Sequence, residues 1–408
     1  MKNHIKILFT IALTLSFILS ACSSSVNNTQ KTPGKKTRTT NKTPDNNPVA
    51  EELSQDSALL PLTLEAIEAG TIFISGKENR KLFIQKNDDG IEPAYDSISV
   101  KPGDKIRFYG YDYVYIDEDQ YLRINCSAAC YVYGNVMSLL EYTHFAGKKE
   151  INKAYSFQNL FYCNTKIKNH ETLDIILPAT TLALHCYDKM FAGCSGLTRA
   201  PELPATNLAD CCYYGMFKSC FSLTTAPELP ATKLVPACYN NMFANCNSLT
   251  KAPALPATTL NIGCYQSMFF GCSSLSTAPE LPATTLDVRC YCDMFNGCKS
   301  LTTAPVLPAT TLATSCYRQM FATCESLTTA PVLPATTLAD YCYNMMFYGC
   351  KSLNSVTCLA TDISATSCNE SWLYGVSATG TFVKAAEMTS WTSGVNGIPD
   401  GWTVVNAD

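Results

Sequence analysis

A repeat of 26 residues fills much of this 408-residue chain and constrains its fold more than any other feature. The dipeptide Met-Phe begins at Met190 and recurs at the same interval seven times in all, ending at Met346. In each unit a Cys-Tyr pair starts four residues before the methionine, and a second cysteine follows it by four. Repeats of this length form stacked arrays, because one unit cannot bury its apolar side without a neighbour.

The pattern within one unit predicts one helix and one short strand. Leu182, Cys186, Met190 and Cys194 are spaced four apart, which is the spacing of one stripe of a helix. Thr180 and Thr181 can cap the start of this helix, and Gly193 occupies the position of a left-handed C-terminal cap. Gly271, Gly297, Gly349 and Asn245 repeat that choice. The segment 197–200 is expected to be extended until Pro201 and Pro204 stop it, so we predict an α/β solenoid.

The motif Met-Phe-x-Gly-Cys-x-Ser-Leu, with its Leu-x-x-Ala continuation, resembles the BspA-like leucine-rich repeats of bacterial surface proteins. The resemblance covers residues 134–408, and it implies a leucine-rich-repeat-like solenoid that binds host or matrix proteins. The chain departs from the family in its longer Leu-x-x-x-Cys-Tyr-x-x-Met-Phe segment and in the Ala-Pro of its strand. These departures leave the strand length and the curvature open.

The N-terminus has the order of a secretory signal. Lys2 and Lys6 precede an apolar stretch over 7–18, and Leu19-Ser20-Ala21-Cys22 follows. This ending resembles a bacterial lipoprotein signal, which implies that Cys22 becomes the lipidated mature N-terminus. An ordinary cleavable signal with a chance cysteine is the alternative. Residues 23–58 are rich in Ser, Asn, Thr, Lys and Pro, and we expect a disordered tether there.

We expect six regions along the chain. Between the tether and the repeats, short apolar-alternating segments and turns such as Asp88-Asp89-Gly90 predict a small β-sandwich. Trp372 lies 26 residues after Met346 and indicates a degenerate last repeat, and 402–405 can form a closing strand. The predicted regions are a lipoprotein signal (1–22), a tether (23–58), a β-sandwich-like domain (59–136), an N-terminal cap with a degenerate first repeat (137–176), seven repeats (177–358), and a degenerate last repeat with a C-terminal cap (359–408).

The chain contains 22 cysteines, which need an explanation in an exported protein. Cys126 and Cys130 flank a plausible hairpin tip and form a possible disulfide, with two free thiols as the alternative. Within a helical unit the two repeated cysteines would lie ~12 Å apart, too far to bond. We therefore interpret the fourteen repeated cysteines as buried free thiols, with cross-unit bridges or metal binding as alternatives. Cys211, Cys292 and Cys358 stand outside this pattern and are candidates for reactive or paired thiols.

Composition and motifs exclude several function classes. Charged residues make up only 16% of the chain and the net charge is -4, which argues against a nucleic-acid binder. His144, His170 and His185 share no motif with a nucleophile, and we find no phosphate loop and no paired carboxylates. We therefore expect no catalysis, no cofactor and no metal.

Binding residues are best sought where the repeats vary. The tyrosine that recurs from Tyr187 to Tyr343 could stack on sugars, but we favour packing between units. Residues 177–358 contain nine Lys or Arg and nine Asp or Glu, so recognition would depend on shape and hydroxyls rather than charge. The candidate ligand-facing residues are Arg199, Glu202, Thr225, Glu228, Lys251, Thr277, Glu280, Thr303 and Thr329. Neutral drift on a solvated face is the alternative interpretation.

These observations favour a lipid-anchored cell-surface protein that uses its repeats for adhesion or ligand recognition. We expect a monomer at the outer membrane surface, with proteins or glycans as partners. A structural spacer of the envelope and a polysaccharide-binding module are the alternatives.

Overall fold

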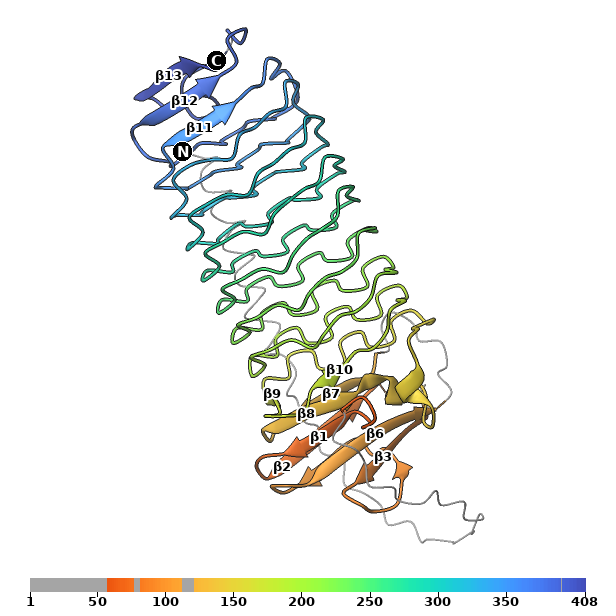
Figure 1. Cartoon of the computed structure of the whole chain (residues 1–408). Coiled ribbons are helices and arrows are strands. Elements are labelled where there is room, and N and C mark those ends of the chain that lie inside the picture. The colour runs from red at the N-terminus through yellow and green to blue at the C-terminus, as the bar shows by residue number, and fades with distance from the viewer. Residues whose placement is uncertain (1–56, 77–80, 112–120, 390) are drawn as a thin grey trace. The chain divides into compact units, whose positions relative to one another are not determined.

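The computed structural model describes residues 57–76, 81–111, 121–389 and 391–408 (Figure 1). The predicted lipoprotein signal with Cys22, and nearly all of the predicted tether, lie outside these residues. Among the described residues, no helix combines the length and the apolar character that spanning a bilayer requires.

Two sheets form the part of the chain that precedes the repeats. The larger has the strand order β10-β8-β1-β6-β3-β4, with β9 also paired to β8, and the smaller has the order β5-β2-β7. Pairs among the first eight strands are antiparallel. The strands are β1 (Thr63–Ala66), β2 (Gly70–Ser75), β3 (Lys81–Lys86), β4 (Glu92–Pro93), β5 (Ser97–Val100), β6 (Lys105–Tyr111), β7 (Arg123–Cys126) and β8 (Cys130–Asn135).

Burial alternates along these strands as it does in sheets with one covered face. In β2, Ile72 and Ile74 are buried while Phe73 between them is exposed. Ile98 in β5 and Ile124 in β7 are buried beside them and join the same core. The alternation arises because successive side chains of a strand point to opposite faces. The described residues of the predicted segment 59–136 therefore fold as two sheets, each with a buried face.

The segment after β8 returns to the larger sheet before the repeats begin. Two short 3-10 helices come first, η1 (Val136–Leu139) and η2 (Phe145–Gly147). Strands β9 (Ile167–Asn169) and β10 (Ile175–Ile176) then pair in parallel with β8. The cap thus adds parallel strands to the sheet of the preceding domain.

The predicted helix in each unit is wrong: the described residues contain no α-helix, and 182–194 forms a chain of turns (Figure 1). Every fourth residue has a left-handed backbone, with φ of 51° at His185, 51° at Lys189 and 77° at Gly193. The same triple recurs in every later unit and reaches Ser367, Ser371 and Gly375. The left-handed conformation predicted at Gly193 is confirmed, but it ends a turn rather than a helix.

Two kinds of backbone hydrogen bond alternate along this segment. The N–H groups of Cys186, Met190 and Cys194 donate to carbonyls three residues back, at 3.0–3.2 Å, and close the turns. The N–H groups of the alternate residues donate to carbonyls of the next coil, as in Tyr187 to Cys212 at 2.9 Å and Phe191 to Met216 at 3.0 Å. A helix would satisfy all of these groups internally. Here half of them join successive coils, and the four-residue turn reproduces the side-chain spacing of a helix.

The buried side chains form continuous columns through the stacked coils. The Tyr187 and Tyr213 rings lie 5.6 Å apart, and the Phe191 and Phe217 rings lie 5.7 Å apart. All seven repeated tyrosines are only 1% exposed, which confirms the packing interpretation and removes them as a sugar-stacking surface. Each such ring stabilises the fold by roughly 1.5–3 kcal/mol through burial.

The fourteen repeated cysteines are buried in two further columns, with free thiols. In the second column each thiol donates to the phenylalanine carbonyl of the preceding coil, as Cys220 does to Phe191 and Cys246 to Phe217, both at 3.1 Å. Burial raises the pKa of Cys220 and of Cys272 to about 12. The column therefore supplies both packing and bonds between coils.

The last copy closes the stack with aromatic rings and a small sheet. Trp372 takes the place that follows Tyr343, at a ring distance of 6.3 Å, and its indole N–H donates to the Gly397 carbonyl. Strands β11 (Ser355–Cys358), β12 (Gly380–Lys384) and β13 (Trp402–Asn406) pair in parallel in that order. The predicted closing strand is confirmed as β13.

Substitutions at Ser267 distinguish these turns from a helix. Ser267 has φ 54° and its N–H donates to the Cys292 carbonyl. Ser267→Gly should raise the free energy of unfolding by about 1 kcal/mol, because glycine adopts this backbone without strain. Ser267→Val should lower it by about 1–3 kcal/mol. Urea unfolding tests both; a helix would instead be weakened by glycine.

The buried thiols predict a loss of stability in alkaline solution. Free thiols in the unfolded chain titrate near pH 8.5, whereas the buried ones have raised pKa values. The stability they contribute is therefore complete below about pH 8.5 and is lost above it, by about 1.4 kcal/mol per buried thiol per pH unit. The urea midpoint, measured with reductant at about pH 7.5 and about pH 9.5, should fall steeply. An unchanged midpoint would contradict the buried columns.

Candidate functional site

The candidate ligand-facing residues lie in two rows on the extended segments of the coils. Parallel bridges link members of the first row directly, as from Thr225 to Lys251 and from Thr277 to Thr303. Residues of the second row lie three positions later in each coil and are all exposed. The first row is Arg199, Thr225, Lys251, Thr277, Thr303 and Thr329; the second row is Glu202, Glu228, Ala254, Glu280, Val306 and Val332.

Proline prevents these extended segments from forming a continuous sheet, but each segment still has one buried and one exposed face. In the first unit Leu203 and Ala205 are buried, whereas Glu202 and Pro204 are exposed, as in a strand. Pro201 and Pro204 have no N–H, so a continuous ladder of hydrogen bonds cannot pass through them. The rows are therefore held by isolated bridges and by the buried side chains beneath them.

The second row changes character along the stack. Its first units carry Glu202 and Glu228, whereas its last two carry Val306 and Val332, which are 78% and 54% exposed. The exposed first-row hydroxyls Thr303 and Thr329 lie in the same two coils. The end of the array thus presents uncharged apolar and hydroxyl groups together.

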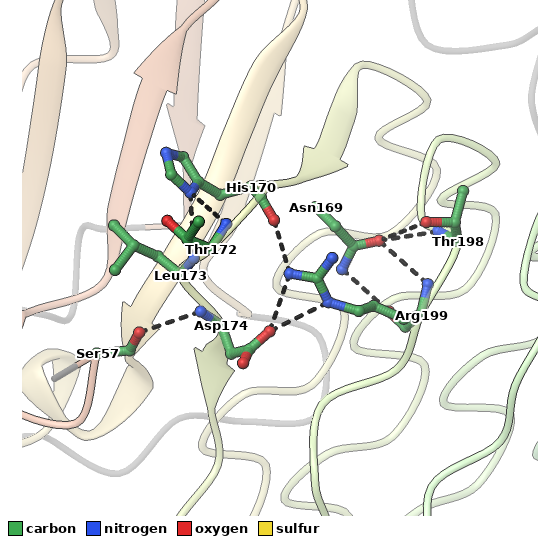
Figure 2. Close-up of polar contacts among 8 residues, drawn as sticks. All are labelled: Ser57, Asn169, His170, Thr172, Leu173, Asp174, Thr198 and Arg199. Carbon is green, nitrogen blue, oxygen red and sulfur yellow. Dashed lines mark hydrogen bonds and ion pairs between the residues drawn. The ribbon is translucent and has the colours of Figure 1, made fainter. Parts of the chain in front are cut away.

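Arg199 does not fit the expectation of a free ligand-facing residue. Figure 2 shows its guanidinium turned toward the segment that precedes the repeats. Its Nη2 donates to Asp174 Oδ1 at 3.0 Å and to the His170 carbonyl at 2.6 Å, and its Nε donates to the same carboxylate at 3.1 Å. Arg199 therefore joins the cap to the first coil, and its contact with a ligand stays a prediction.

Asn169 and His170 complete this junction (Figure 2). Asn169 Oδ1 accepts the N–H groups of Thr198 and Arg199 at 2.8 and 3.1 Å, and its amide donates to the Arg199 carbonyl. The His170 ring accepts the N–H groups of Thr172 and Leu173 through Nδ1. These polar side chains thus add to the backbone bonds that join the cap to the first coil, such as that from the Phe157 N–H to the Cys186 carbonyl at 2.8 Å.

Cys126 and Cys130 lie where the predicted hairpin places them. Cys126 ends β7, Cys130 begins β8, and both thiols are free and buried. A hydrogen bond between the two thiols lowers the pKa of Cys126 and raises that of Cys130. The two sulfurs are thus neighbours, and the disulfide stays a prediction.

Among the three cysteines outside the repeated pattern, only Cys211 is partly exposed. Cys292 is buried and its thiol donates to Asp293 Oδ2 at 3.2 Å. Cys358 is buried in β11. Among these three, only Cys211 is therefore accessible to solvent, and its reactivity stays a prediction.

The structure also brings together residues that the sequence analysis kept apart. His185 and Cys211 occupy the same position of successive coils, and the backbone bonds from His185 to Asp210 and from Tyr187 to Cys212 set them side by side. His185 Nδ1 lies 3.0 Å from Asp188 Oδ2, and this contact is the main reason that the pKa of His185 is raised to about 9. His185 and Cys211 are 26 positions apart, which is one repeat length and places them side by side in a stack. A motif defined over neighbouring residues does not include such a pair.

No family model matches the chain, and comparisons with curated proteins and with solved structures find no match. Within the described ranges, no group of three or more His, Cys, Asp or Glu residues is arranged to hold a metal ion. The relation to BspA-like repeats stays a prediction.

Substitutions at the junction should separate the contacts of the Asn169 amide from those of the Arg199 guanidinium. Asn169→Ala should lower the free energy of unfolding by about 1–2 kcal/mol, because it removes three hydrogen bonds that a half-buried amide makes to the first coil. Arg199→Met should cost about 0.5–1 kcal/mol, since its ion pair with Asp174 is largely solvated. Urea unfolding measures both. Equal effects would show that the guanidinium matters more than its exposure indicates.

Proposed function

We propose that this chain is a lipid-anchored cell-surface protein whose repeat array, related to the BspA-like leucine-rich repeats, binds a protein ligand. The Leu-Ser-Ala-Cys22 ending of the signal supports the anchor. The aligned exposed rows of the stacked coils support recognition, because repeat proteins bind along such extended surfaces.

The observation that carries this proposal is the exposure of Val306 and Val332. Equivalent positions in three earlier coils hold glutamate, so the stack itself does not require an apolar residue there. Adjacent apolar groups in water favour contact with a partner, and the neighbouring threonine hydroxyls can bond it. The repeats carry no net charge, so shape and hydroxyl contacts would set the specificity.

A binding panel with matched charge variants tests this proposal. The full chain should bind one or more proteins of an extracellular-matrix panel. The double variant Val306→Glu and Val332→Glu should weaken that binding at least about tenfold, because it buries carboxylates in the interface. The measurement is the dissociation constant by biolayer interferometry.

The control makes the same chemical change on the turn segments of the Val306 coil and a neighbouring one. Ile262 and Val288 are exposed residues of the turn segment, and the variant Ile262→Glu and Val288→Glu should bind as the parent does. Equal losses in both variants would contradict a site on the second row. Binding to a glycan panel alone would favour the polysaccharide-binding module. No detectable binding to either panel would favour the structural spacer.

A further inference from the structure

Cys211, His185 and Asp188 form a cluster that neither the packing of the coils nor the proposed ligand surface requires. The position of His185 is held by Cys211, Ala237 and Gly263 in the next three coils, so the fold tolerates many residues there. The position of Asp188 is held by Tyr214 and Asn240. The combination of these three residues is therefore not repeated in the next coils, although the backbone around it is.

The stacking of the coils fixes this cluster. The His185 N–H donates to the Asp210 carbonyl at 3.1 Å, and the Tyr187 N–H donates to the Cys212 carbonyl at 2.9 Å, so the two bonds bracket Cys211. On the other side, the Tyr155 ring stacks on the His185 ring at 5.2 Å. The imidazole is thus held between the coil before it and the coil after it.

Asp188 holds the imidazole from within its own coil. Its side chain is only 3% exposed, and its Oδ2 also accepts the Gln158 amide at 3.0 Å. Its Oδ1 accepts no hydrogen bond, and the Lys189 ammonium lies 3.4 Å away. A buried carboxylate in this position favours the charged form of the imidazole, and it raises the pKa of His185 to about 9.

Cys211 differs from the repeated thiols in its access to solvent. The fourteen repeated cysteines are buried, whereas Cys211 is half-buried and the His185 side chain is 27% exposed. Thiols beside an imidazolium and within reach of solvent are the reactive cysteines of proteins, because the cation stabilises the thiolate that attacks.

We infer that Cys211 is a thiol-modification site that exchanges with low-molecular-weight disulfides, with His185 and Asp188 as positioning residues. The Cys211 sulfur attacks one sulfur of the disulfide, and a bond forms between them while the original S–S bond breaks. The displaced thiolate takes up the proton that Cys211 loses, so one thiol is consumed and one is released. This site is independent of the proposed ligand surface.

The rate of modification at each cysteine tests this inference. The full chain is treated with oxidised glutathione or with iodoacetamide under native conditions, and modified peptides are quantified by mass spectrometry. Cys211 should react about tenfold faster than Cys163, the other half-buried thiol of the described residues. Equal rates at the two cysteines, or faster reaction at a repeated thiol, would overturn the inference.

Variants separate the roles of the neighbours. Asp188→Asn should slow the modification of Cys211 between about pH 7 and pH 9, where the parent imidazole is still charged. It should leave the rate of modification unchanged near pH 6. The charged and titratable groups around the imidazole are Tyr155, Asp188, Lys189 and Cys211.

His185→Gln should slow the modification of Cys211 over the whole pH range tested. His170→Gln, the same change at the junction, should leave that rate unchanged. Urea unfolding of each variant identifies any loss of structure. If the variants of His185 and Asp188 stay folded and leave the modification rate of Cys211 unchanged, these two residues only pack against it and do not position it for reaction.

Discussion

The hydrogen bonds between successive coils are the interaction on which the structure depends. They exist because a left-handed residue recurs every fourth position and turns alternate N–H groups away from their own coil, as at Tyr187 and Phe191. Each such group then meets the carbonyl of the next unit. One unit alone would leave these groups and its buried tyrosine and phenylalanine exposed, so the coils are stable only as a stack.

The same arrangement explains why thiols are abundant in the core. The space between coils is narrow, and the second cysteine of each unit places its sulfur against the phenylalanine carbonyl of the preceding coil, as Cys272 does at 3.1 Å. Serine would bury a more strongly polar group there, and alanine would lose the contact. The repeated core thiols therefore serve packing and hydrogen bonding, whereas Cys211 lies beside a histidine and is accessible to water.

Much of this fold could be predicted from the sequence, because the repeat interval and the apolar columns follow from residue identity. The buried stacks of Tyr187 and Phe191, the closing strand and the left-handed Gly193 were all accessible in this way. The helix was wrong because a spacing of four is shared by a helical stripe and by a series of four-residue turns. Gly215 and Gly263, inside the predicted helices, were evidence against it. The roles of Arg199 and His185 depended on contacts between units, which no local pattern reveals.

The most direct test of this account is the removal of one whole unit. Deleting residues 263–288 joins Ile262 to Arg289 and keeps every left-handed position in step, since Gly263 and Arg289 are equivalent. Deleting half as many residues, 263–275, breaks that correspondence. Urea unfolding followed by circular dichroism should show one cooperative transition for the first variant, with a modestly lower midpoint, and none for the second. Equal behaviour of the two deletions would contradict a stack held by bonds between equivalent residues.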